Sequence, residues 1–325
     1  MPHKFNGRHR HKFAKKKYRV TNWRAHNESL RNRGNLTIWI TTDALKHWVA
    51  PQRGSRGGKR QYTDLAITLC LTLSMVYKLP LRQTQGLMRS ISKLMQLEVL
   101  VPDFSTLSRR GRNLVLPVRP KTKRTDPIHL AVDSTGLKIF GVGEWLRKKH
   151  TTGANRKKWR KLHLGLDLTS GEIICADLTK DNVGDPSALP CLLDQVEVPV
   201  AHFLADGAYD GAPTSGLLQE RFGETVEIII PPPRNAIPSP QSASELSIRD
   251  RHIAEIQNRG RMAWQSSSGY NQRSRIETQI GCWKTVIGPK LKARYFENQQ
   301  VEVKIGVTIL NKMTELGRPV FEQIA

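Results

Sequence analysis

The segment IHLAVDSTGLKIF, residues 128–140, is a run of strand-forming residues with a single carboxylate near its middle. Its apolar and β-branched composition predicts a β-strand. Asp133 interrupts the apolar run, and a charge in a central strand is costly to bury unless it is paired or bound to a metal ion. We therefore expect a functional role for Asp133, with an ordinary turn or cap carboxylate as the alternative.

The segments that follow this strand predict a mixed α/β fold, because strand patterns come first and then alternate with helical ones. The predicted order is strands at 128–140, 161–168 and 172–179, a helix at 185–196, a strand at 200–210, a helix at 214–223, a strand at 225–233 and a helix from 270. This order is typical of the ribonuclease H-like fold, a mixed five-stranded sheet with helices on both faces. In that fold the first and fourth strands are neighbours, so Asp133 and Asp206 are expected to meet.

The segment YNQRSRIETQIGCWK (270–284) predicts a helix with two distinct faces. At about 100° per residue, Tyr270, Arg273, Glu277 and Lys284 share a stripe roughly 60° wide, beside an apolar face. A simpler alternative is a solvated helix in which Arg273 and Glu277 form an i,i+4 pair worth roughly 0.2–0.5 kcal/mol. If the predicted fold is correct, the helix instead adds a third carboxylate, that of Glu277, to Asp133 and Asp206.

Three converging carboxylates would repel one another unless cations lie between them. Hard oxygen ligands are typical of Mg²⁺ or Mn²⁺ rather than of zinc. Two such ions about 3.5–4 Å apart can activate an attacking oxygen and stabilise a leaving oxygen at a phosphodiester. The four cysteines form no C-x-x-C pair, which argues against structural zinc and against a disulfide framework.

The charge of the chain indicates a polyanionic partner. The 325 residues include 52 Lys and Arg against 28 Asp and Glu, a formal net charge of +24. The cations are clustered, with nine in residues 1–24 and eight in residues 145–166, and neither stretch contains an acidic residue. Clustered cations favour nucleic acid through counterion release, although a single such cluster could be a solvated face. The chain shows no secretory signal and no apolar run long enough to span a bilayer, so we expect a cytoplasmic protein.

The N-terminal third is expected to be separate from the sheet domain. Residues 1–35 predict a flexible basic arm, and residues 36–120 predict a helical DNA-binding region. Within it, residues 82–114 fit a helix-turn-helix or a plain helical hairpin equally well. The linker RPKTKRTDP (119–127) is the predicted boundary, and residues 121–325 the predicted catalytic domain, with a short insert at about 234–268 that holds one helix near residues 248–258.

Several motifs together resemble bacterial insertion-sequence transposases of the DDE type, in particular the insertion sequence five family. VDSTGLKIFGVGEW is similar to the family's first Asp motif, LADGAYD to its second, and residues 270–284 to its Y-x2-R-x3-E-x6-K signature. The resemblance implies that Asp133, Asp206 and Glu277 are the catalytic carboxylates and bind two Mg²⁺ ions, for which Mn²⁺ can substitute. It also implies that Tyr270, Arg273 and Lys284 contact the phosphate backbone or the transposon end.

The activity implied by this resemblance is DNA transposition in the bacterial cytoplasm, at the nucleoid. The protein is expected to bind the terminal inverted repeats of an insertion sequence, to cleave the ends, and to join the 3′-OH ends to target DNA. Its partners are then double-stranded DNA and at least one further copy of itself, with no membrane. Further candidate DNA contacts are Arg156, Lys157, Lys158, Arg160, Lys161, Arg109 and Arg110. Two alternatives are a nuclease of the same fold that does not join strands, and a non-catalytic DNA-binding protein descended from a transposase.

Overall fold

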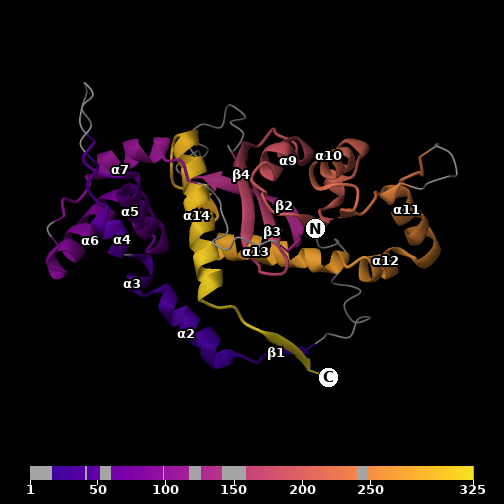
Figure 1. The fold of residues 1–325 in the computed structure, drawn as a ribbon, viewed down its shortest axis with the longest axis horizontal. Coiled ribbons are helices and arrows are strands. Elements are labelled where there is room, and N and C mark those ends of the chain that lie inside the picture. Colours follow the sequence, from indigo (N-terminus) through magenta and orange to yellow (C-terminus); the bar gives the residue numbers. More distant parts are fainter. Residues whose placement is uncertain are drawn as a thin grey trace, which may run out of the picture. The chain divides into compact units, whose positions relative to one another are not determined.

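The computed structural model describes residues 17–40, 42–51, 60–97, 99–116, 126–140, 159–239 and 247–324 (Figure 1). The chain divides into two compact units, Met1–Ile38 with Lys312–Ala325 and, separately, Trp39–Asn311. The predicted boundary at 119–127 lies almost entirely outside the described residues, so the assignment of functional domains stays a prediction.

The smaller unit joins the two ends of the chain. Strand β1 (Lys17–Val20) pairs antiparallel with β8 (Phe321–Ile324), and helix α2 (Trp23–Arg33) follows β1. The Asn22 amide donates to the Arg318 carbonyl at 2.8 Å, and its side-chain oxygen accepts from the Val320 N–H at 2.8 Å. The expected flexible arm is therefore wrong from residue 17 onward, because a distant partner strand orders this segment. Residues 1–16 lie outside the described part of the chain.

The larger unit begins with a helical region. Its helices are α3 (Leu36–Trp39, which starts in the smaller unit), α4 (Thr42–Lys46), α5 (Asp64–Val76), α6 (Leu81–Leu94) and α7 (Phe104–Arg110), followed by the 3₁₀ turn η2 (Gly111–Asn113). Helices α5 and α6 meet at 110°, whereas α6 and α7 are separated by residues 95–103. The predicted short turn between the helices of the 82–114 segment is thus wrong. No single helix in the described ranges is long and apolar enough to cross a membrane, and α5 and α6 pass that test only together, as a bent pair.

A six-stranded mixed sheet forms the centre of the larger unit. Its strands are β2 (Ile128–Ile139), β3 (Trp159–Asp167), β4 (Ile173–Lys180), β5 (Val200–Leu204), β6 (Glu227–Ile229) and β7 (Lys290–Leu291). The order is β4-β3-β2-β5-β6, with β3 antiparallel to its neighbours and β5 and β6 parallel to β2. The predicted order of elements is confirmed. The prediction of five strands missed β7, since two residues carry too little pattern to be recognised.

Each face of the sheet is covered by its own set of helices. Helices α9 (Asp185–Leu193) and α10 (Ala212–Phe222) lie on one side, and α13 (Ser274–Val286) lies on the other (Figure 1). The core under α13 also includes α14 (Phe296–Leu316), through residues such as Val303 and Val307.

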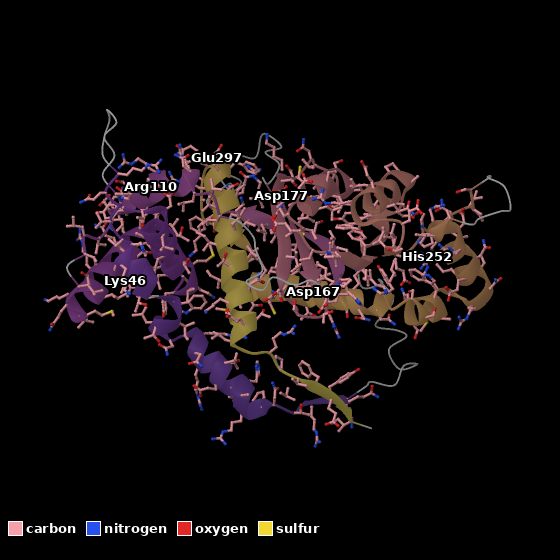
Figure 2. All side chains as sticks on the ribbon, in the orientation of Figure 1. Lys46, Arg110, Asp167, Asp177, His252 and Glu297 are labelled. Atoms are coloured by element: carbon pink, nitrogen blue, oxygen red, sulfur yellow. The ribbon has the colours of Figure 1, made fainter. Side chains whose placement is uncertain are left out.

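At the β3–β4 turn the Asp167 carboxylate, labelled in Figure 2, accepts hydrogen bonds from the Thr169 and Ser170 N–H groups at 3.0 Å.

The segment before α13 contains more helix than expected. The predicted helix near residues 248–258 is present as α11 (Ile248–Arg259), and a second helix, α12 (Arg261–Ser267), follows it. Gly260, at φ 82°, separates the two. The predicted helix over 270–284 begins only at Ser274, because Tyr270–Arg273 form a 3₁₀ turn, η4. The four cysteines are free; Cys70 and Cys175 are buried, and Cys191 and Cys282 are exposed.

Candidate active site

Asp133, on β2, and Asp206, two residues beyond the end of β5, occupy equivalent positions along two neighbouring parallel strands. The ladder between β2 and β5 ends at the pair Ala131 and Leu204, and each aspartate follows its ladder residue by two positions. Because side chains alternate along a strand, both carboxylates leave the sheet where the two strands part. The predicted meeting of Asp133 and Asp206 therefore has a simple cause in the register of the sheet.

Backbone amides hold one oxygen of each aspartate. Asp133 Oδ1 accepts a hydrogen bond from the Ser134 N–H at 2.8 Å. Asp206 Oδ1 accepts from the Ala208 N–H at 3.0 Å and caps the 3₁₀ turn η3 (Gly207–Tyr209). The second oxygen of each carboxylate faces the cationic side chain of Arg273.

Helix α13 brings Glu277 to the same place. Its apolar residues Ile276, Ile280 and Trp283 are buried against the sheet, and this packing fixes the rotation of the helix. Glu277 lies in the first turn of α13, where the helix dipole favours a negative charge. Its side chain is 54% exposed and therefore lies at the mouth of the site.

One guanidinium group lies among the three carboxylates. Arg273 Nη2 is 2.9 Å from Asp133 Oδ2 and 4.0 Å from Asp206 Oδ2, and Nη1 is 2.7 Å from Glu277 Oε1. The Arg273 side chain is only 12% exposed, which makes it far more than the solvated i,i+4 partner of Glu277. Within the described ranges, no group of three or more His, Cys, Asp or Glu side chains is gathered for a metal ion. The group that lies between the three carboxylates is the Arg273 guanidinium.

Burial and charge oppose each other at this site. Burial raises the pKa of the Asp133 carboxyl, Arg273 and the Ser134 N–H lower it, and the other two carboxylates raise it again. For Arg273, burial alone would lower the pKa of the guanidinium, but the carboxylates raise it above its ordinary value. The Arg273 charge therefore opposes the effect of burial on the Asp133 carboxyl and favours its ionised form.

Tyr270 and Tyr209 border the carboxylates. Burial raises the pKa of Tyr270, and its ring lies 5.4 Å from that of Trp264. Trp264 is fully buried and packs in the core of the larger unit. The Tyr209 hydroxyl is buried without a hydrogen-bond partner in the described part of the chain. Sequence reasoning gave Tyr209 no role, although it belongs to the LADGAYD motif.

The candidate DNA contacts are scattered, and several already have partners within the protein. Lys161 Nζ donates to Asp185 at 3.1 Å and to the Val183 carbonyl at 3.0 Å, and Arg160 Nε donates to Gln299 at 3.0 Å. Arg110 (Figure 2) binds the Tyr62 carbonyl and Asp64.

The other described candidates are more exposed, although Arg109 Nη2 donates to Thr106 Oγ1 within its own helix at 3.4 Å. Lys284 is exposed on α13, two turns beyond Glu277, and Arg109 is exposed at the end of α7. Arg156, Lys157 and Lys158 lie outside the described residues. DNA contact by all of these side chains stays a prediction.

The sequence of the chain matches models of a known protein family. Two family profiles, both described as "Transposase DDE domain", match residues 31–142 and 124–312. The second alone covers more than half of the chain and includes all three carboxylates.

Solved structures were also matched, at low similarity. The chain is 12% identical to a piggyBac transposase in a synaptic complex with hairpin DNA, over 92% of this chain and 78% of that one, with a TM-score of 0.38. It is 11% identical to the Mos1 mariner transposase in a paired end complex, over 92% and 94% of the two chains, with a TM-score of 0.22. At TM-scores below 0.5 these likenesses carry no part of the assignment. On the two family matches, the chain belongs to the transposase DDE domain family and is a DDE-type DNA transposase.

Proposed function

We propose that this transposase binds the terminal inverted repeats of an insertion sequence of the insertion sequence five family, hydrolyses the strand at each end, and joins the freed 3′-OH to target DNA. The observation that carries the proposal is the meeting of Asp133, Asp206 and Glu277 around one guanidinium, on a sheet with the element order of the ribonuclease H-like fold. The place of action is the bacterial cytoplasm. Pairing two transposon ends requires at least two copies of the chain.

Membership of the family implies a dependence on divalent metal ions, and the residues present fit such ions in their chemistry. The three carboxylates supply only hard oxygen ligands, which favours Mg²⁺ with Mn²⁺ as a substitute. Bound ions would activate the attacking oxygen and stabilise the leaving one. The chain contributes placement, since Ser134 and Ala208 each fix one carboxylate oxygen and so aim the other. No Ser or Tyr nucleophile is required.

A pair of like charges on the sheet supports a DNA path beside the site. Lys138 on β2 and Lys290 on β7 are Cα partners on adjoining strands. Like charges directly opposite each other destabilise a sheet, and a phosphate between them would remove that penalty. The Lys138 ammonium lies 5.5 Å from the centre of the Trp159 ring, and that ring lies over Gly136. We infer that a phosphate backbone runs along this end of β2.

The N-terminal helices support a separate role in DNA recognition. The 110° angle between α5 and α6 and their four-residue connection match a helix-turn-helix, one helix earlier in the chain than the sequence predicts. Helix α6 exposes Arg82, Arg89 and Lys93, which share a stripe about 40° wide at 100° per residue. We infer that α6 is the helix that enters a groove of the terminal repeats.

The test is cleavage by a variant that keeps the shape of the site. Glu277→Gln removes the charge of a metal ligand while retaining hydrogen-bonding capacity, so DNA binding should persist and cleavage should be lost. Glu297→Gln, the same change at an exposed position on α14, is the matched control and should cut normally. DNA that carries the element's ends is incubated with saturating protein and Mg²⁺, and the cut positions are mapped. Normal cutting by Glu277→Gln would remove Glu277 from the site.

Strand joining is tested on its own. Pre-cut ends with a free 3′-OH are mixed with a target plasmid, and joined products are counted. Cleavage without joining would identify a nuclease of the same fold. Binding without metal-dependent cleavage by the unchanged protein would identify a non-catalytic DNA-binding protein.

A further inference from the structure

We propose that Arg273 is a stand-in for the metal ions: it holds the three carboxylates together in the metal-free protein, is displaced when divalent ions bind, and then becomes available to DNA phosphate. The proposal rests on the proposed function, because it concerns the same carboxylates. It makes metal binding and DNA binding mutually dependent through one side chain.

The first argument is competition for the same atoms. Asp133 Oδ1 is taken by the Ser134 N–H, and Oδ2 by Arg273 at 2.9 Å. Glu277 gives Oε1 to the same guanidinium at 2.7 Å. An ion that binds through Asp133 Oδ2 and Glu277 Oε1 needs the two oxygens that Arg273 holds, so guanidinium and metal exclude each other at these atoms.

The second argument is charge. Three carboxylates and one guanidinium leave two formal negative charges, so the metal-free site still attracts cations. Two divalent ions would more than neutralise the three carboxylates. A guanidinium among them would then be repelled at short range in a partly buried site, where such interactions are strong. An anion is its natural next partner, and phosphate accepts a guanidinium through two parallel hydrogen bonds.

The third argument is that little else in the structure holds the guanidinium. The hydrogen bonds that the structure gives to its two terminal nitrogens go to Asp133 and Glu277, while Arg273 Nε is buried without a partner in the described part of the chain. Arg273 also lies in the 3₁₀ turn η4, outside the regular helix α13, and Gly269 precedes that turn in a left-handed conformation, at φ 71°. Loss of the carboxylates to metal therefore frees the side chain.

The consequence follows from thermodynamic linkage. If a metal ion releases Arg273 toward phosphate, DNA must in turn strengthen metal binding by the same factor. The metal-free protein is then held in a state of weak end binding, without any change of fold. Removal of Arg273 should raise metal affinity, because the competitor is gone, and should weaken the dependence of DNA binding on metal.

The experiment measures binding by the full chain, without catalysis. Ca²⁺, which prefers oxygen ligands, is titrated calorimetrically into the DNA-free protein and into Arg273→Gln. We expect Arg273→Gln to bind Ca²⁺ at least about fivefold more tightly, the lower end of typical couplings between sites. Arg275→Gln is the matched control, because it removes the same charge two residues further along the chain. The Arg275 side chain donates to the Leu168 carbonyl at 2.6 Å. It should change Ca²⁺ affinity far less.

A second readout uses duplex DNA. The affinity of the unchanged protein for terminal-repeat DNA should rise when Ca²⁺ is added, and the rise should be smaller for Arg273→Gln. If Arg273→Gln does not fold, Arg273→Lys serves instead, since its ammonium lacks the planar fork that offers separate nitrogens to the two carboxylates, and its Ca²⁺ affinity should be intermediate. Equal or weaker Ca²⁺ binding by Arg273→Gln, or the same gain in Arg275→Gln, would overturn the inference. Absence of Ca²⁺ binding by the unchanged protein would instead overturn the proposed metal site and this inference with it.

Discussion

Gly306→Ala should destabilise the protein, whereas Gly281→Ala should not. Both glycines lie in long helices, Gly306 in α14 and Gly281 in α13. A Cβ at Gly306 would lie 2.5 Å from Trp283 Cη2, 3.0 Å from Cζ3 and 3.2 Å from Cζ2, whereas a Cβ at Gly281 would meet nothing within 4 Å. The pair therefore differs in the contact with Trp283 and shares the change in backbone propensity.

The magnitude follows from two opposing effects. Replacing a helical glycine with alanine stabilises by up to about 1 kcal/mol at either site. At Gly306 the added methyl overlaps a ring that is 1% exposed and enclosed by the core, and such overpacking costs about 1–3 kcal/mol. Because the propensity gain cancels between the two variants, their difference in free energy of unfolding should be about 1–3 kcal/mol.

The measurement is urea unfolding, monitored by circular dichroism. The slope of the free energy of unfolding against urea concentration is compared between variants, because it reports how much surface unfolding exposes. Trp283→Phe removes the three ring atoms that the methyl would meet. In that background the difference in free energy of unfolding between Gly306→Ala and Gly281→Ala should disappear. The coupling energy between positions 306 and 283 should then lie in the usual range for contacting residues, about 0.5–3 kcal/mol. Equal stability of Gly306→Ala and Gly281→Ala in the unchanged background would show that α14 does not press on Trp283. The contact of α14 with Trp283 would then not help to hold Glu277 in place.

Two further outcomes are expected. Replacing Lys138 and Lys290 with Gln should reduce the slope of log affinity for DNA against log salt by about 1.8, or about 0.9 for each lost phosphate contact; an unchanged slope would place the DNA elsewhere. Burial lowers the pKa of His163, whose side chain is fully buried beside Thr179. As pH falls below about 6.5, His163 is therefore protonated in the unfolded chain before it is protonated in the folded one. The free energy of unfolding should then decrease as pH is lowered, by at most about 1.4 kcal/mol per pH unit for this one group. His163→Gln should flatten that acid limb in pH-dependent urea unfolding, and an unaltered limb would contradict the assignment.

The three carboxylates could be predicted because each belongs to a strong local pattern. Asp133 interrupts an apolar strand and Asp206 follows one, and adjacency of their strands follows from the order of elements. Glu277 follows from helical periodicity beside a clear apolar face.

The role of Arg273 could not be predicted in this way. Its spacing from Glu277 indicates an exposed pair, but the direction of its side chain depends on Asp133, 140 residues earlier in the chain. The same limit explains β7, whose two residues form a strand only because β2 offers them a free edge. It also explains the placement of Lys161, which was expected to face DNA but is held by Asp185 through a tertiary contact.

The pairing of β1 with β8 has a consequence for synthesis of the chain. Arg19 and Glu322, which face each other across this ladder, are 303 residues apart. At about 5–20 residues per second, β1 leaves the ribosome roughly 15–60 s before its partner strand does. During that interval the first strand is an unpaired edge, which chaperones or a neighbouring nascent chain can reach. A message truncated before codon 321 would therefore yield a product whose larger unit has every strand but whose smaller unit never closes.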